Sequence, residues 1–125
     1  GYNMAGYFRH WLDMGKKMKK HPKIFAVNWF RMDEKGKFLW PGFSENLRVL
    51  EWIIDRYDNK IGAMKTPIGY TPYPSDIDMT GLELPDSAME RLLNTDKKEW
   101  LEELHGIKKF FSVFRKDLPR ELWQE

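Results

Sequence analysis

The sequence contains no cysteine among its 125 residues. This absence excludes disulfide bonds, thiolate metal sites and a cysteine nucleophile together, and it is compatible with a reducing compartment. No segment approaches the roughly 18 consecutive apolar residues of a membrane-spanning helix. The first residues, GYNMAGYF, lack the basic and apolar regions of a signal peptide. Position 1 is not methionine, so we expect the chain to be part of a longer protein.

Phosphate-binding and catalytic motifs are also missing. The sequence contains neither G-x-x-x-x-G-K-S/T nor G-x-G-x-x-G, the two glycine-rich patterns that bind nucleotide phosphates. Residues 42–46, GFSEN, resemble a nucleophile elbow but lack its final glycine. His10, His21 and His105 are too scattered to form a metal-ligand motif. The sequence therefore predicts no catalytic residue and no metal ligand within this chain.

Charge of one sign is not in excess either. There are 21 Lys and Arg against 19 Asp and Glu, a net charge of +2, so the overall field indicates little about partners. Lysines cluster over residues 16–23, where a helix is expected to end, and cations there suit the negative end of the helix dipole. We interpret the cluster as a solvated helix end, and neither nucleic acid nor a membrane is an expected partner.

Aromatic residues, in contrast, are abundant. They make up 15% of the chain, with 8 Phe and 6 Trp, and many of them fall within residues 23–57. Aromatic side chains at this density either fill a core or line a slot for a flat ligand. This stretch therefore organises both the expected fold and the expected function.

The hydrophobic pattern predicts an α+β fold, with helices around a short antiparallel hairpin. Residues 24–30 have the composition of a strand buried on both faces, residues 33–36 form a turn signal, and residues 37–40 can return antiparallel. Helices are expected over residues 3–18 with Asn3 as N-cap, over 44–58 with Ser44 as N-cap, over 86–93, and after Thr95. The apolar stripe of that last helix, from Trp100 to Phe114, is expected to be core. Residues 59–85, rich in Gly and Pro, are expected to cross the surface as an extended, irregular loop, in which Ile68 and Tyr70 can still form a short strand or edge. A last turn follows Leu118.

The expected hairpin brings Phe30, Phe38, Phe43 and Asn46 together. A purine ring binds well between aromatic faces, at about 1–3 kcal/mol per stacked base, and an asparagine amide offers both a donor and an acceptor to a base edge. Core packing explains the same aromatic residues, and the pattern alone favours it, although a ligand slot stays open as the other interpretation.

The same stretch resembles the C-terminal part of the GTP-dependent phosphoenolpyruvate carboxykinases. The resemblance rests on Asn28-Trp29-Phe30-Arg31, on Gly36-Lys37-Phe38-Leu39-Trp40-Pro41-Gly42-Phe43, and on Glu45-Asn46 with Arg48-Val49-Leu50. Gly1-Tyr2-Asn3, His10-Trp11-Leu12, Thr66-Pro67-Ile68-Gly69-Tyr70 and Asp117-Leu118-Pro119 extend it over nearly the whole chain. Ser44 stands where that family usually has Gly, and Ala26 where a His is common.

The resemblance implies that Phe30 and Phe43 sandwich a guanine base, that Phe38 flanks it with Trp29 in support, and that Asn46 reads its edge. It implies a cytoplasmic, decarboxylating lyase of gluconeogenesis that converts oxaloacetate and GTP to phosphoenolpyruvate, carbon dioxide and GDP with Mn²⁺ or Mg²⁺. Residues 1–125 are then a single piece of a larger α/β C-terminal domain, with guanine nucleotide and the remainder of the enzyme chain as partners. Catalytic residues and metal ligands are expected outside this chain, which alone should be inactive.

Two other interpretations remain at this stage. The chain can be a stand-alone interaction module whose aromatic and basic residues bind a peptide or single-stranded nucleic acid. Alternatively, the aromatic residues simply fill a core, and an exposed strand at 24–30 then favours dimerisation.

Overall fold

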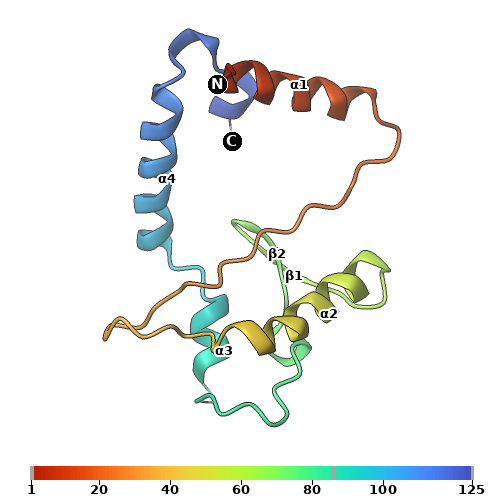
Figure 1. Ribbon diagram of the computed structural model, residues 1–125, viewed down its shortest axis with the longest axis vertical. Helices are drawn as coiled ribbons and strands as arrows, with labels where there is room; N and C mark the ends of the chain where they lie inside the picture. Colours follow the sequence, from red (N-terminus) through yellow and green to blue (C-terminus); the bar gives the residue numbers. More distant parts are fainter. Residues whose placement is uncertain (1, 86, 125) are drawn as a thin grey trace. The chain divides into compact units, whose positions relative to one another are not determined.

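A computed structural model describes residues 2–85 and 87–124 (Figure 1). Over these residues the chain forms four α-helices, short 3₁₀ turns and one two-stranded antiparallel sheet, so the predicted α+β class is confirmed. The chain divides into two compact units. Gly1–Pro22 with Asp96–Glu125 form one, here called the helical unit, and Lys23–Thr95 form the other, the pocket unit. None of the described helices is long and apolar enough to cross a membrane.

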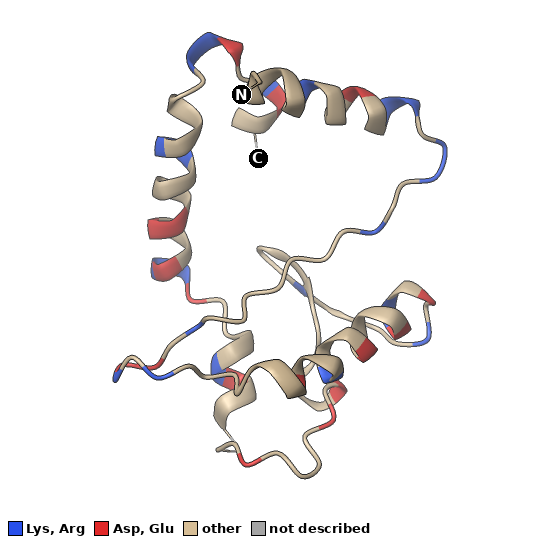
Figure 2. Cartoon of the chain, in the orientation of Figure 1, with Lys and Arg blue, Asp and Glu red and all other residues tan. Residues whose placement is uncertain are grey.

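The helical unit contains α1 (Met4–Lys17) and α4 (Lys97–Ser112). Asn3 caps α1 as predicted, because its Oδ1 accepts a hydrogen bond from the backbone N–H of Ala5 at 2.9 Å. Asp96 caps α4 in the same way, accepting from the N–H of Glu99 at 2.9 Å. Along α4, Glu99, Glu102 and Glu103 precede Lys108 and Lys109 (Figure 2), the order that the helix dipole favours, whereas Lys97 and Lys98 at the start of the helix depart from it.

Aromatic edge-to-face contacts join the two helices of this unit. The ring of Phe8 on α1 lies 6.3 Å from that of Phe111 and 5.6 Å from that of Phe114, centroid to centroid. The chain then turns through η3 (Arg115–Asp117) and η4 (Arg120–Trp123), and Trp123 contacts Phe111. The C-terminal turns thereby return to the helix that precedes them.

The prediction that the α4 stripe is core is wrong for this chain. No described residue of α4 is buried, and Leu104 in the middle of the stripe is 50% exposed. The apolar period that predicted the helix is present, but in the part of the chain that the structure describes its aromatic cover comes from Phe8 and the C-terminal turns and reaches one end of the stripe.

The pocket unit is built around α2 (Asn46–Tyr57), which follows the turn η1 (Phe43–Glu45). Its other elements are β1 (Met64–Thr66), β2 (Gly69–Thr71), η2 (Pro74–Asp76) and α3 (Ser87–Leu93). Their core consists of four buried residues, Trp40, Trp52, Ile77 and Met89, with partly buried apolar side chains around them. Trp52 of α2 and Met89 of α3 thus pack in one cluster with Trp40, which precedes α2 in the chain.

The hairpin lies elsewhere than predicted. Residues 24–30 form no strand, and Ile24 is 89% exposed. Only Phe25 and Trp29, four positions apart, pack on the core, so this apolar run is not buried on both faces. A single isolated bridge joins Met32 to Phe38. The sheet instead pairs β1 with β2, within the segment predicted to be an irregular loop.

Two boundaries also differ from the sequence prediction. Ser44 does not cap α2, because it lies inside η1 and its hydroxyl donates to Glu45 Oε1 at 3.3 Å. Residue Asp86, predicted to begin a helix, lies outside the described residues, and α3 is seen from Ser87. The segment 59–85 also supplies a core residue, Ile77, so it is more than a surface crossing.

Candidate functional site

A tight turn presents two of the predicted aromatic residues side by side. The carboxylate of Asp33 accepts hydrogen bonds from the N–H groups of Lys35 and Lys37, each at 2.9 Å. The bond from Lys37, with smaller help from Lys35 and nearby cations, lowers the pKa of Asp33 below its ordinary value. Gly36 adopts a φ of 74°, which closes the turn at no steric cost.

The returning chain then places Phe38 beside Phe30. Their ring centroids lie 6.0 Å apart at 62°, an edge-to-face contact. Leu39 N–H donates to Arg31 C=O at 2.8 Å, and the guanidinium of Arg31 donates to the carbonyl oxygens of Leu92 and Asn94 at the end of α3. The turn is therefore attached to the rest of the pocket unit.

Gly42 directs the chain from the turn into α2. Its φ of 94° and ψ of −143° lie in a region that is strained for residues with a side chain. A Cβ at this position would meet no atom within 4 Å, so backbone conformation rather than space requires the glycine. The N–H of Glu45 then donates to Gly42 C=O at 2.9 Å and starts the turn that carries Phe43.

The start of α2 is held by one ion pair. Arg48 Nε lies 2.6 Å from Glu45 Oε2, and the guanidinium also donates to the carbonyl oxygens of Asp78 and Thr80. The hydrogen bond from Arg48 is the largest cause that lowers the pKa of Glu45 below its ordinary value. Arg48 thereby joins loop 78–80 to the first turn of α2, which begins at Asn46.

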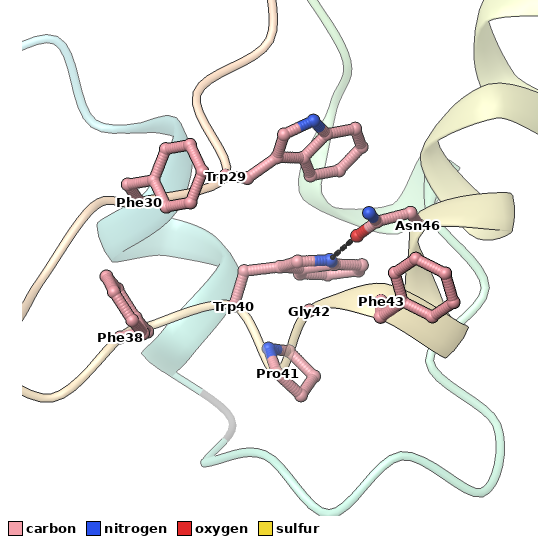
Figure 3. Close-up of a pocket in the computed structure, with 8 residues that line it drawn as sticks. All are labelled: Trp29, Phe30, Phe38, Trp40, Pro41, Gly42, Phe43 and Asn46. Carbon is pink, nitrogen blue, oxygen red and sulfur yellow. Dashed lines mark hydrogen bonds between the residues drawn. The ribbon is translucent and has the colours of Figure 1, made fainter.

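Trp40 and Asn46 form the polar part of the site. The indole Nε1–H of Trp40 donates to Asn46 Oδ1 at 2.9 Å (Figure 3). Trp40 is only 4% exposed. Within residues 2–85 and 87–124 the Asn46 amide nitrogen makes no hydrogen bond, and in Figure 3 this nitrogen lies on the side away from Trp40.

These elements enclose a hollow of about 280 Å³. All five residues predicted for the site line it, together with three that the prediction did not include: Trp29, Phe30, Phe38, Phe43 and Asn46, then Trp40, Pro41 and Gly42. In Figure 3, Phe30 and Phe38 lie on one side, and Phe43 and Asn46 on the other. Trp40, Pro41 and Gly42 lie between predicted residues in the run 36–43 that carries the family resemblance, and this position is the signal that could have identified them.

Three phenylalanines of the hollow are exposed to a degree that is unusual for such large apolar rings. Phe43 is 96% exposed, Phe30 69% and Phe38 50%. Exposed aromatic residues that converge on a concavity are typical of a ligand site. The arrangement can hold one flat, apolar-faced group and donate a hydrogen bond to its edge.

The side chains around the hollow do not suit a metal site. Among the described residues, no three His, Cys, Asp or Glu side chains lie together in a way that could hold a metal ion. The lining of the hollow contains no charged side chain. The residues of this hollow therefore do not fit the metal that the family resemblance implies.

Comparison with known proteins gives a consistent result over the whole chain. Residues 1–125 match the family described as the phosphoenolpyruvate carboxykinase C-terminal P-loop domain. The chain is 50% identical to a phosphoenolpyruvate carboxykinase (GTP) of Chlamydia muridarum, 46% to one of Thermoplasma volcanium and 44% to one of Corynebacterium kroppenstedtii. Each match includes 100% of this chain but only 20–21% of the relative. The chain thus spans about a fifth of the length of these relatives.

Proposed function

The chain belongs to the family of GTP-dependent phosphoenolpyruvate carboxykinases, and from this membership we propose that it forms the guanine-binding part of such an enzyme. The observation that carries the proposal is the convergence of Phe30, Phe38 and Phe43 with Asn46 on one hollow. Phe30 and Phe43 stack against the two faces of the base, Phe38 flanks it, Trp29 supports the wall, and Asn46 contacts the edge.

The physical chemistry of the hollow suits a purine. Every base has an apolar π-face, and stacking on aromatic side chains contributes about 1–3 kcal/mol per base. A ligand that covers Phe43 also removes from water a ring that is 96% exposed. The lining offers no cation to phosphate groups, so affinity from this site alone is weak and the phosphates are bound elsewhere in the enzyme.

The proposal extends to the parent protein. The full-length enzyme converts oxaloacetate and GTP to phosphoenolpyruvate, carbon dioxide and GDP in cytoplasmic gluconeogenesis, with Mn²⁺ or Mg²⁺ bound by residues outside this chain. Residues 1–125 form a single piece of its larger α/β C-terminal domain. The chain spans about a fifth of its relatives, so it contacts the remainder of the enzyme and is inactive without it.

An NMR titration of the protein tests the site directly. GDP is added to one sample and ADP to another, and the ring signals of Phe30 and Phe43 are followed with the side-chain amide of Asn46. We expect GDP to shift these signals at lower concentration than ADP. Leu104, an exposed apolar residue of the helical unit, is the internal control and should not respond.

Equal shifts with GDP and ADP would contradict guanine specificity. Shifts spread over exposed apolar residues of both units, Leu104 included, would contradict a defined site.

A further inference from the structure

We propose that Trp40 is a positioning residue that sets the base preference of the site, by holding the Asn46 amide with its donor group toward the ligand. The inference rests on the proposed function and deepens it. It concerns the class of purine selected, namely one with a carbonyl oxygen rather than an amino group at position 6.

The orientation of the Asn46 amide follows from the chemistry of its partner. An indole N–H can only donate a hydrogen bond. The amide atom that faces Trp40 Nε1 at 2.9 Å must therefore be the oxygen, and the amide NH₂ group must take the opposite side. This assignment does not depend on telling oxygen from nitrogen by shape, which is the usual source of error for asparagine.

Burial of Trp40 keeps its hydrogen bond to Asn46 in place. Its side chain is 4% exposed and belongs to the buried core of the pocket unit, with Trp52, Ile77 and Met89. Asn46 is the first residue of α2, and its backbone is fixed by that helix. A half-turn of the amide would oppose the NH₂ group to the indole N–H, two donors facing each other, and would leave a buried donor without a partner.

A fixed donor distinguishes the two purines. On the edge that carries N7, guanine presents two acceptors, N7 and O6, whereas adenine presents the acceptor N7 beside a donor, the 6-amino group. A freely rotating asparagine pairs well with adenine, because its oxygen can accept from the 6-amino group while its nitrogen donates to N7. Trp40 keeps this oxygen turned toward its own N–H, so the oxygen does not face the base. The NH₂ group that remains matches O6 and opposes the 6-amino group.

The same core provides a matched control. Trp52 is also buried, at 6% exposed, and its Nε1–H also donates to a side-chain oxygen, Asp76 Oδ2 at 3.3 Å. Asp76 does not line the hollow. Loss of the indole N–H at Trp52 thus removes a comparable bond from the same core without touching the base site.

The experiment compares Trp40→Phe with Trp52→Phe in the protein, and measures dissociation constants for GDP, IDP and ADP. IDP has the 6-carbonyl but lacks the 2-amino group. We expect the unaltered protein to prefer both GDP and IDP over ADP. Trp40→Phe should lower that preference about fivefold to tenfold, the effect of one hydrogen bond, through a gain for ADP as the amide becomes free to turn. Trp52→Phe should leave the ratio unchanged.

A second variant separates orientation from packing. Replacement of Trp40 by 3-benzothienylalanine exchanges the N–H for sulfur and keeps the bicyclic shape, and it should give the same loss of preference. Circular dichroism confirms that each variant is folded.

The outcomes distinguish the two proposals. If the unaltered protein prefers GDP and the benzothienyl variant keeps that preference, the role of Trp40 is overturned and the proposed function stands. If the unaltered protein binds GDP and ADP equally, both are overturned. A loss of preference in Trp52→Phe as large as in Trp40→Phe also overturns the role of Trp40, because general loosening of the core would then explain it.

Discussion

Exposed apolar side chains occur in both units of the protein, but their arrangement differs. In the helical unit, Leu104 and its neighbours follow the helical repeat along one face of α4. In the pocket unit, Phe30, Phe38 and Phe43 come from a turn and the start of a helix, and they converge on a hollow beside Asn46. A straight apolar stripe suits another long surface, whereas a concave group with one oriented donor suits a small flat ligand. Exposure alone therefore does not identify the binding site; convergence does.

The largest expected effect tests whether the pocket unit depends on its own core. Trp52 is buried among Phe25, Asp76 and the other core residues. Trp52→Ala should lower the free energy of unfolding by about 3–5 kcal/mol, since it removes a large buried ring and leaves a cavity. Denaturant unfolding followed by circular dichroism measures this loss. A loss below about 1 kcal/mol would show that the four buried residues do not hold this unit together.

An intermediate effect is expected at the rim of the hollow, on binding rather than on stability. Phe43 is 96% exposed, so Phe43→Ala should change the free energy of unfolding by less than about 0.5 kcal/mol. It should weaken GDP binding by about 1–3 kcal/mol, the value of one stacked face. Calorimetric or NMR titration measures the affinity. Leu47→Ala, also at an exposed apolar residue but outside the hollow, is the control, and an equal loss there would remove the distinction between rim and surface.

The smallest effect is expected in the helical unit. Leu104 is half exposed and lies mid-way along α4. Leu104→Ala should alter the free energy of unfolding of this chain by less than about 0.5 kcal/mol, because little burial is lost and alanine favours helix. Denaturant unfolding of both proteins compares them. If the loss approached that of Trp52→Ala, the α4 stripe would have to be covered in solution, and the two units would differ less than the structure indicates.

Local signals predicted much of the fold. Asn3 has a short polar side chain at the head of an apolar period, and it caps α1 as expected. The helices over residues 46–57 and after Thr95 follow from the 3.6-residue period in the same way. These features depend on neighbours in sequence, and such neighbours are visible without a structure.

The errors concern features that depend on distant contacts. The run at 24–30 has strand composition, but a strand needs a partner, and in the described residues its neighbours form only the bridge between Met32 and Phe38. A short strand at Ile68 and Tyr70 was allowed as an exception within the expected loop, but its pairing with β1 was not predicted, because Pro and Gly dominate the surrounding composition; Gly69, with a φ of 123°, makes that turn possible. Burial of the α4 stripe was expected from the helical spacing of its apolar residues alone. That spacing predicts a helix, but it does not show which other part of the protein covers its apolar face.

The residues of the candidate site could be predicted from the sequence, but the hydrogen bond that orients one of them could not. Four of its residues, Phe30, Phe38, Phe43 and Asn46, were expected together from the sequence pattern, and the family resemblance added Trp29. All five line one hollow. That they bind guanine stays a prediction. The hold of Trp40 on Asn46 could not be expected from the sequence, because a hydrogen bond between positions six apart depends on the conformation of Gly42 between them.

The ammonium of Lys23 joins two points of the chain that lie on either side of the site residues. It donates to the carbonyl oxygens of Arg56 and Tyr57 and to Asn59 Oδ1, at 2.7–3.1 Å, and so joins the first residue of the pocket unit to the end of α2. Every residue that lines the hollow lies between these two points of the chain. The residues that line the hollow thus lie in one continuous segment, whereas the core partners Ile77 and Met89 of that segment come from later in the chain. Insertions outside Lys23–Thr95 can lengthen the protein without separating the site from its core, and recombination can transfer this whole unit as a single block.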